Sequence, residues 1–75
     1  MHIDNSECLR NFGSFIKEAR TSQGCFQADI AEAVGIKQPY YSQIEAGTRN
    51  VDLVLAMKIC KALKVDLSDY IHTYL

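Results

Sequence analysis

The sequence has few of the features that mark secreted, membrane or metal-binding proteins. It contains no tryptophan and one proline, and its three cysteines lie far apart without CxxC spacing. An odd number of cysteines so placed argues against a disulfide framework and a zinc site. No apolar run approaches the roughly 20 residues of a membrane span, and the initial stretch MHIDNSEC is unlike a signal peptide. We therefore expect a cytoplasmic protein without metal or membrane contact.

Net charge and length are also small. Eight Lys and Arg against nine Asp and Glu give a formal net charge of −1. Overall charge therefore does not indicate a nucleic-acid partner, and such a role must depend on local charge distribution. A chain of 75 residues, 48% of them hydrophobic, has the composition of one globular domain with a modest core.

Residues suited to catalysis are scarce. The only two histidines, His2 and His72, are isolated near the two ends of the sequence. An enzyme would need a nucleophile beside a base, or convergent carboxylates, around a pocket that so short a chain has little room to form. We expect no enzymatic activity, no cofactor and no small-molecule substrate.

Apolar residues recur with helical spacing in five segments. The segments cover residues 8–22, 27–34, 38–46, 53–63 and 67–75. The glycines Gly24, Gly35 and Gly47 are typical helix ends, and Asp52 and Asp66 are suitable N-caps for the last two segments. No segment alternates as a strand does.

The sequence therefore predicts an all-α fold of five short helices. Residues 1–7 are expected to form a flexible N-terminal arm, and residues 8–75 the folded domain. The fourth helix carries the apolar residues Leu53, Ala56, Met57, Ile59, Cys60 and Leu63.

The second and third helices are separated only by residues 35–37, which is the helix-turn-helix pattern. The third helix presents hydrogen-bonding side chains where most surface helices carry Lys and Glu: Gln38, Tyr40, Ser42 and Gln43. In this motif the second helix of the pair enters the major groove, and a glutamine suits bidentate contact with adenine. The pattern favours a base-reading helix over an ordinary solvated one.

Residues 12–71 resemble the Cro/repressor-type (XRE) helix-turn-helix family. The resemblance lies in Arg20 late in the first helix, in QADIAEAVGI, in QPYYSQIEAG and in the closing KICKALKVDLSDYI. It implies a lambda-repressor-like DNA-binding domain, with the helix-turn-helix at helices two and three and double-stranded DNA as the partner.

The resemblance also implies roles for single side chains. Base edges would be read by Gln38, Ser42 and Gln43. The DNA backbone would be contacted by Gln27, Arg49 and Asn50. Arg20 and Glu45 match a family ion pair between the first and third helices, which is physically sensible because an unpaired buried charge is costly.

The sequence departs from the family pattern at three helix ends. Phe26 and Lys37 stand where the family usually has capping Ser or Thr, and Lys64 where it usually has Gly. A lysine at a helix N-terminus is disfavoured by the helix dipole, so Lys37 is best explained by a nearby phosphate. Tyr40, expected to be exposed, could contact a phosphate or a thymine methyl. Phe26 has no evident role.

Assembly is the last expectation. One recognition helix reads only a few base pairs, so such domains usually bind as dimers. The apolar stripe of the last helix is wide, and its surplus, chiefly Tyr70, Tyr74 and Leu75, would be exposed unless paired. The predicted interface of the homodimer consists of Val54, Leu55, Leu67, Tyr70, Ile71, Tyr74 and Leu75. The alternative is that all of these side chains pack inward.

The sequence therefore predicts a sequence-specific transcriptional regulator, a repressor or controller that acts as a dimer on a palindromic operator. The alternative is a helix-turn-helix-derived protein-interaction module, or an antitoxin, with little DNA binding of its own.

Overall fold

The computed structural model describes residues 4–75, which fold into helices joined by short turns, without any strand in that range. The helices are α1 (Asn5–Ser22), α2 (Gln27–Val34), α3 (Gln38–Ala46), α4 (Leu53–Ala62) and α5 (Leu67–Tyr74). The all-α fold of five helices predicted from the sequence is confirmed.

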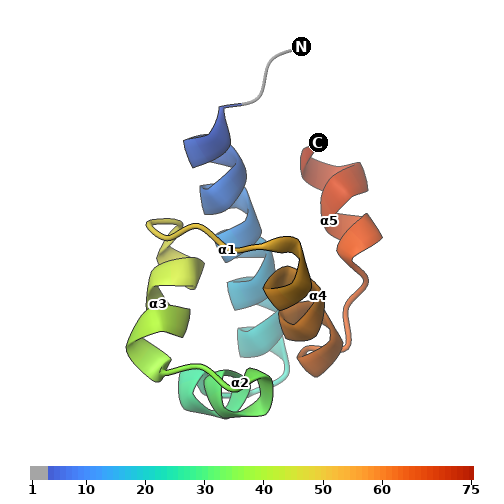
Figure 1. The fold of residues 1–75 in the computed structure, drawn as a ribbon. Helices are drawn as coiled ribbons and strands as arrows, with labels where there is room; N and C mark the ends of the chain where they lie inside the picture. Colours follow the sequence, from blue (N-terminus) through green and yellow to red (C-terminus); the bar gives the residue numbers. More distant parts are fainter. Residues whose placement is uncertain (1–3) are drawn as a thin grey trace.

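The longest helix, α1, lies between two groups of helices. It packs against α3 on one side and α5 on the other, while α2 contacts both α3 and α4, and α4 contacts α5. Figure 1 shows α3 and α5 at opposite sides of the molecule, with the start of α1 and the end of α5 at the same end. The outer sides of α3 and α5 therefore face in different directions.

The core lies where all five helices meet. Its buried side chains are Phe12, Ile16, Ile30, Ala31, Tyr41, Ile44, Ala56, Ile59, Cys60, Leu63 and Tyr70. Two of them, Tyr41 and Ile44, come from α3 and are fully buried. They fix which side of α3 faces the core and therefore which side faces outward.

Most helix ends lie where the sequence placed them. Gly35 and Gly47 end α2 and α3 in the left-handed conformation, with φ of 79° and 75°. The carboxylates of Asp52 and Asp66 each accept a backbone N–H of the following first turn, at 2.8 and 2.9 Å. These ends set the lengths of the helices on both sides of the predicted helix-turn-helix.

The start of α1 differs from the expectation. The Oδ1 of Asp4 accepts the N–H of Ser6 at 2.7 Å, and this N-cap starts the helix at Asn5. The expected arm at residues 1–7 is therefore wrong for residues 5–7, which are helical, while residues 1–3 lie outside the described part. Apolar periodicity begins only at Cys8, whereas the capping side chain of Asp4 starts the helix at Asn5.

A glycine brings α1 close to α3. A Cβ atom at Gly13 would overlap the carbonyl oxygens of Ile44 and Glu45, so only glycine allows this approach. Gly47 makes a second close contact, because a Cβ there would lie 2.6 Å from the Cα of Arg10. The α1 backbone therefore fixes the position of the whole of α3.

Candidate nucleic-acid interface

The turn between α2 and α3 is short and well bonded. After Gly35, the N–H of Ile36 donates to the carbonyl oxygen of Ala31 at 3.0 Å, and the Ile36 side chain packs against the core. Lys37 then occupies the N-cap position of α3 without a side-chain hydrogen bond to the helix. The two helices form one unit in which the N-terminal end of α3 is exposed.

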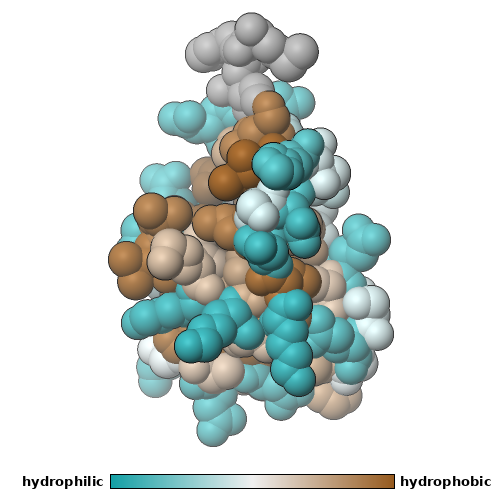
Figure 2. Space-filling view, turned by 90° about the vertical axis from the view of Figure 1, so that its right-hand side faces the viewer, coloured by the Kyte–Doolittle hydropathy of each residue, from teal (hydrophilic) through white to brown (hydrophobic). Residues whose placement is uncertain are grey.

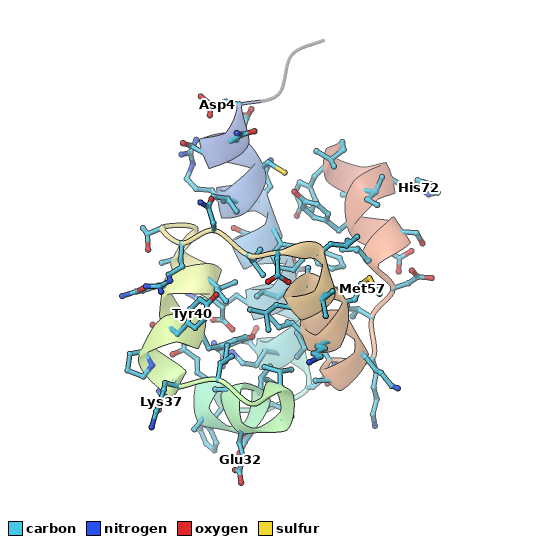
Figure 3. All side chains as sticks on the ribbon, viewed as in Figure 1. Asp4, Glu32, Lys37, Tyr40, Met57 and His72 are labelled. Carbon is cyan, nitrogen blue, oxygen red and sulfur yellow. The ribbon has the colours of Figure 1, made fainter. Side chains whose placement is uncertain are left out.

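The α3 helix has a buried side and an outer side. Away from the core the helix carries side chains that can donate and accept hydrogen bonds: Gln38 and Gln43, both exposed, and Ser42, half-buried. In Figure 3, Lys37 lies at the N-terminal end of α3 and Tyr40 one turn further along the helix. The structure therefore places the predicted base-reading residues together on one accessible helix.

Arg49, in the loop after α3, folds back onto this helix. Its guanidinium carbon lies 4.4 Å from the centre of the half-buried Tyr40 ring, a cation–π contact. Its Nη1 donates to the Oε1 of Gln43 at 3.2 Å. The sequence analysis assigned Arg49 to the DNA backbone and Gln43 to a base, and the structure joins the two side chains directly.

The ion pair expected between Arg20 and Glu45 is present. The Nε of Arg20 donates to Oε2 of Glu45 at 2.7 Å, and its Nη2 donates to Oε1 at 3.0 Å. The side chains are 11% and 2% exposed, so this bidentate pair is nearly removed from water. A third donor of Arg20, Nη1, binds the carbonyl oxygen of Cys25 at 2.9 Å. Arg20 therefore links α1, the turn before α2, and α3.

Gln27 joins this cluster, which the sequence analysis did not foresee. Its Nε2 donates to Oε1 of Glu45 at 3.1 Å, so its side chain is turned toward the protein. Burial disfavours the charged form of Glu45, but the hydrogen bonds from Arg20 and Gln27 outweigh burial and lower its pKa below the usual value. Glu45 is therefore an ionised carboxylate, and the phosphate contact implied for Gln27 stays a prediction.

Phe26, the residue before Gln27, is 73% exposed. It occupies the N-cap position of α2 but has no side-chain acceptor, and its N–H donates to the Oδ2 of Asp29 at 2.9 Å. The carboxylate of Asp29 therefore stabilises the start of α2 in place of a capping hydroxyl.

The other predicted backbone contacts remain accessible. Lys37, directly before α3 in the chain, and Asn50, in the loop after α3, are both exposed. Together with Arg49 they supply two cations and an amide next to the glutamines. The net charge of −1 does not reveal these two cations, because acidic residues elsewhere in the chain offset them.

The α4–α5 side has a different character from α3. Of the seven residues predicted for a dimer interface, three are exposed: Val54, Ile71 and Leu75. Three are half-buried against the core: Leu55, Leu67 and Tyr74. The expectation that Tyr70 lies on the surface is wrong, because its side chain is only 4% exposed.

Tyr70 is buried because α5 turns it toward α1. Its ring packs edge-on against Phe12, with 5.3 Å between ring centroids, and its hydroxyl donates to the carbonyl oxygen of Cys8 at 2.9 Å. Burial raises the pKa of this phenol, so it stays protonated and can keep donating. Tyr70 is thus a residue of the domain's own core.

Two further apolar residues of α4, Leu53 and Met57, are exposed, although nothing in the sequence marks them as surface residues. With Val54, Ile71 and Leu75 they form a set that we call the α4–α5 patch. A groove of about 320 Å³ lies beside it, between α1, α4 and α5, and both Leu53 and Ile71 line it. Figure 2 shows groups of apolar side chains on this face of the molecule, with hydrophilic side chains between them.

Residues 4–75 contain neither a cluster of metal-ligating side chains nor a helix that could span a membrane. That range holds no group of three or more His, Cys, Asp or Glu side chains arranged around a metal position. Its helices are all too short or too polar to cross a bilayer. The cysteines Cys8, Cys25 and Cys60 are free thiols.

Comparison with known proteins gives consistent matches. Residues 16–70 match the model of a family described as Helix-turn-helix. The uncharacterized HTH-type transcriptional regulator YgzD of Bacillus subtilis is 37% identical over 54 residues, which cover 72% of this chain and 82% of that protein. The uncharacterized HTH-type transcriptional regulator Rv0474 of Mycobacterium tuberculosis is 38% identical over 53 residues, 71% of this chain. The match spans only 38% of that relative's length.

A solved structure extends the likeness to three dimensions. The restriction-modification controller protein C.AhdI from Aeromonas hydrophila superposes with a TM-score of 0.77 at 34% identity. The superposition covers 83% of this chain and 94% of that chain.

Proposed function

The chain belongs to the helix-turn-helix family of transcriptional regulators, and from this membership we propose that it reads a palindromic operator as a homodimer. In this proposal each protomer inserts α3 into the major groove of double-stranded DNA. The bound dimer acts as a repressor or controller of the neighbouring promoter. Because such a regulator must reach the DNA that it binds, we include in the proposal the cytoplasmic location expected from the sequence.

One observation carries the proposal most: the outer side of α3 is accessible and rigidly held. Gln38 and Gln43 are exposed while Tyr41 and Ile44 of the same helix are buried, and Glu45 ties this helix to α1. In helix-turn-helix proteins the recognition helix contacts base edges with its N-terminal residues. We assign base reading to Gln38 and Gln43, with Ser42 beside them.

Backbone contacts are proposed for the residues that flank α3. Lys37, at the N-terminus of α3, gains a favourable partner when a phosphate lies near it. Phosphate contacts are likewise proposed for Gln27, Tyr40, Arg49 and Asn50. In general, phosphate contacts position a protein on DNA and carry no sequence information directly.

The homodimer is proposed through the α4–α5 patch. An isologous contact there would leave α3 of each protomer free, because α3 and α5 lie on opposite sides of α1 (Figure 1). The two recognition helices should then lie about 34 Å apart, one turn of B-DNA. The C.AhdI structure is of a controller protein, which supports regulation of a promoter as the outcome of binding.

The proposal is tested by selecting bound duplexes from a random pool and measuring their affinity by fluorescence anisotropy at several salt concentrations. Wild type should bind with a strong salt dependence and prefer a two-fold symmetric sequence. Lys37→Ala should weaken all duplexes alike and reduce the salt slope by about one unit, whereas Gln38→Ala should relax preference at one position per half-site. Absence of salt-sensitive binding would refute the proposal and favour the protein-interaction alternative.

A further inference from the structure

The contact between Arg49 and Gln43 constrains what Gln43 can offer a base. A guanidinium has five N–H donors and no acceptor, so only the oxygen of the Gln43 amide can face it. Arg49 Nη1 lies 3.2 Å from that oxygen, which assigns the amide orientation on chemical grounds. The Nε2 of Gln43, a donor with two hydrogens, is therefore directed away from Arg49.

Tyr40 holds Arg49 in this position. The guanidinium carbon lies over the ring, 4.4 Å from its centre, while Nη1 binds Gln43. An arginine stacked on a ring is pre-organised and loses less conformational freedom when its remaining N–H groups bind a partner. The three side chains form a unit, which we call the Tyr40–Arg49–Gln43 cluster.

The cluster presents donors and a positive charge to whatever lies in front of it. Guanine offers two acceptors in the major groove, N7 and O6, whereas adenine offers N7 and the N6 amino donor. The N6 amino group of adenine would meet the donors of the guanidinium, and the Gln43 oxygen, which already accepts from Arg49, has only its second lone pair left to accept from it. The O6 of guanine can instead accept from the guanidinium and from the Gln43 amide nitrogen.

We propose that Arg49 is a specificity-determining residue, which orients Gln43 so that the two side chains together read guanine in preference to adenine. This inference rests on the proposed DNA-binding function. It replaces two expectations from the sequence: that Gln43 reads adenine as an isolated glutamine does, and that Arg49 contributes only sequence-independent backbone contact.

The test begins with duplexes selected by wild type and identifies the base pair whose preference is lost in Gln43→Ala. At that position we expect guanine to be preferred over adenine by about tenfold. Replacing this guanine by 7-deazaguanine, which lacks the N7 acceptor, should weaken binding, whereas inosine, which keeps N7 and O6, should bind as guanine does.

The role of Arg49 is tested with Arg49→Lys, which keeps the charge but not the planar fork. We expect this variant to lose the guanine preference at the same base pair as Gln43→Ala. In the Gln43→Ala/Arg49→Lys double variant the loss should be no greater than in either single variant, because the residues act as a unit. Tyr40→Leu should lose the same preference, whereas Tyr40→Phe should keep it even if all duplexes bind more weakly.

The outcomes separate the inference from the function it rests on. If wild type binds no duplex in a salt-sensitive way, both fail. If wild type binds but prefers adenine at the Gln43 position, or if Arg49→Lys keeps the wild-type base preference, the inference alone is overturned. Circular dichroism checks that each variant stays folded, which is expected because Gln43 and Arg49 are exposed.

Discussion

Glu45 is the residue on which the position of α3 depends most. Its carboxylate is 2% exposed and receives hydrogen bonds from Arg20 and Gln27. Glu45→Ala would leave the Arg20 guanidinium, itself 11% exposed, without its partner. We expect this change to lower the free energy of unfolding by about 3–5 kcal/mol in urea titrations. The matched control, Glu32→Ala at an exposed helical site, should change it by less than about 0.5 kcal/mol.

The same carboxylate makes stability depend on pH in a defined direction. Its pKa is lowered in the folded protein because hydrogen bonds from Arg20 and Gln27 outweigh the effect of burial. A group with a lowered folded pKa stabilises the fold above its unfolded pKa, about 4.3 for Glu, and this stabilisation is lost as pH falls through the folded value.

Wild type and Glu45→Gln should therefore differ most in unfolding free energy near pH 7 and progressively less as the pH falls below about 4. Parallel urea titrations from pH 7 to pH 3 measure this difference. A constant difference over that range would contradict an ionised Glu45 as the source of the stabilisation.

At this scale the sequence predicted some contacts and missed others. The Arg20–Glu45 pair was implied by the family resemblance and is present. The link from Gln43 to Arg49 was not foreseen, because it depends on how the loop after Gly47 folds back over α3. No periodicity in the sequence specifies that loop path, and the side-chain rotamers follow from it.

The backbone is strained at Lys64, just after the end of α4. Lys64 adopts the left-handed conformation, with φ of 59°, where the family usually has glycine. A residue with a Cβ atom is disfavoured there by roughly 1–2 kcal/mol, whereas glycine adopts this conformation freely.

Lys64→Gly should therefore stabilise the domain by about 1 kcal/mol, even though glycine usually destabilises a folded chain. Thermal and urea unfolding measure the change. Lys61→Gly, in the last turn of α4 with helical geometry, is the matched control and should destabilise by a similar amount. If both variants were destabilised equally, the strain assigned to Lys64 would be absent.

The helices themselves were predicted better than their orientation. Glycine ends and aspartate caps are local chemistry, so α2 and α3 end, and α4 and α5 begin, at the predicted residues. The side of α5 that faces the core depends on how it packs against α1 and α4. For this reason the sequence does not show that Tyr70 is buried or that Leu53 and Met57 are exposed.

The molecule as a whole carries two unlike surfaces on opposite sides of α1. One is the outer side of α3, with hydrogen-bonding and cationic side chains, and the other is the apolar α4–α5 patch. A small domain rarely leaves large apolar residues together in water unless they meet a partner. In the proposed two-fold dimer, the patch of each protomer would pack against the patch and groove of the other.

The dimer is tested best at Ile71, which belongs to the patch and is exposed. Tyr74 suits the test less well, because its ring packs against Phe15 and Tyr70 and its loss would disturb the fold. Sedimentation equilibrium at micromolar concentration should show wild type as a dimer and Ile71→Asp as largely monomer. Thr73→Asp places the same charge at an exposed site of α5 outside the patch, so it should leave the dimer intact.

Loss of the dimer should also appear in DNA binding. Ile71→Asp keeps the whole outer side of α3, so it should still bind a single half-site as wild type does, with the same base preference. On the two-fold operator it should lose the affinity gained when two linked recognition helices bind together, which commonly amounts to about 10²-fold or more. Wild type that sediments as a monomer, or Ile71→Asp that binds the full operator as tightly as wild type, would refute dimerisation through the α4–α5 patch while leaving recognition by α3 in place.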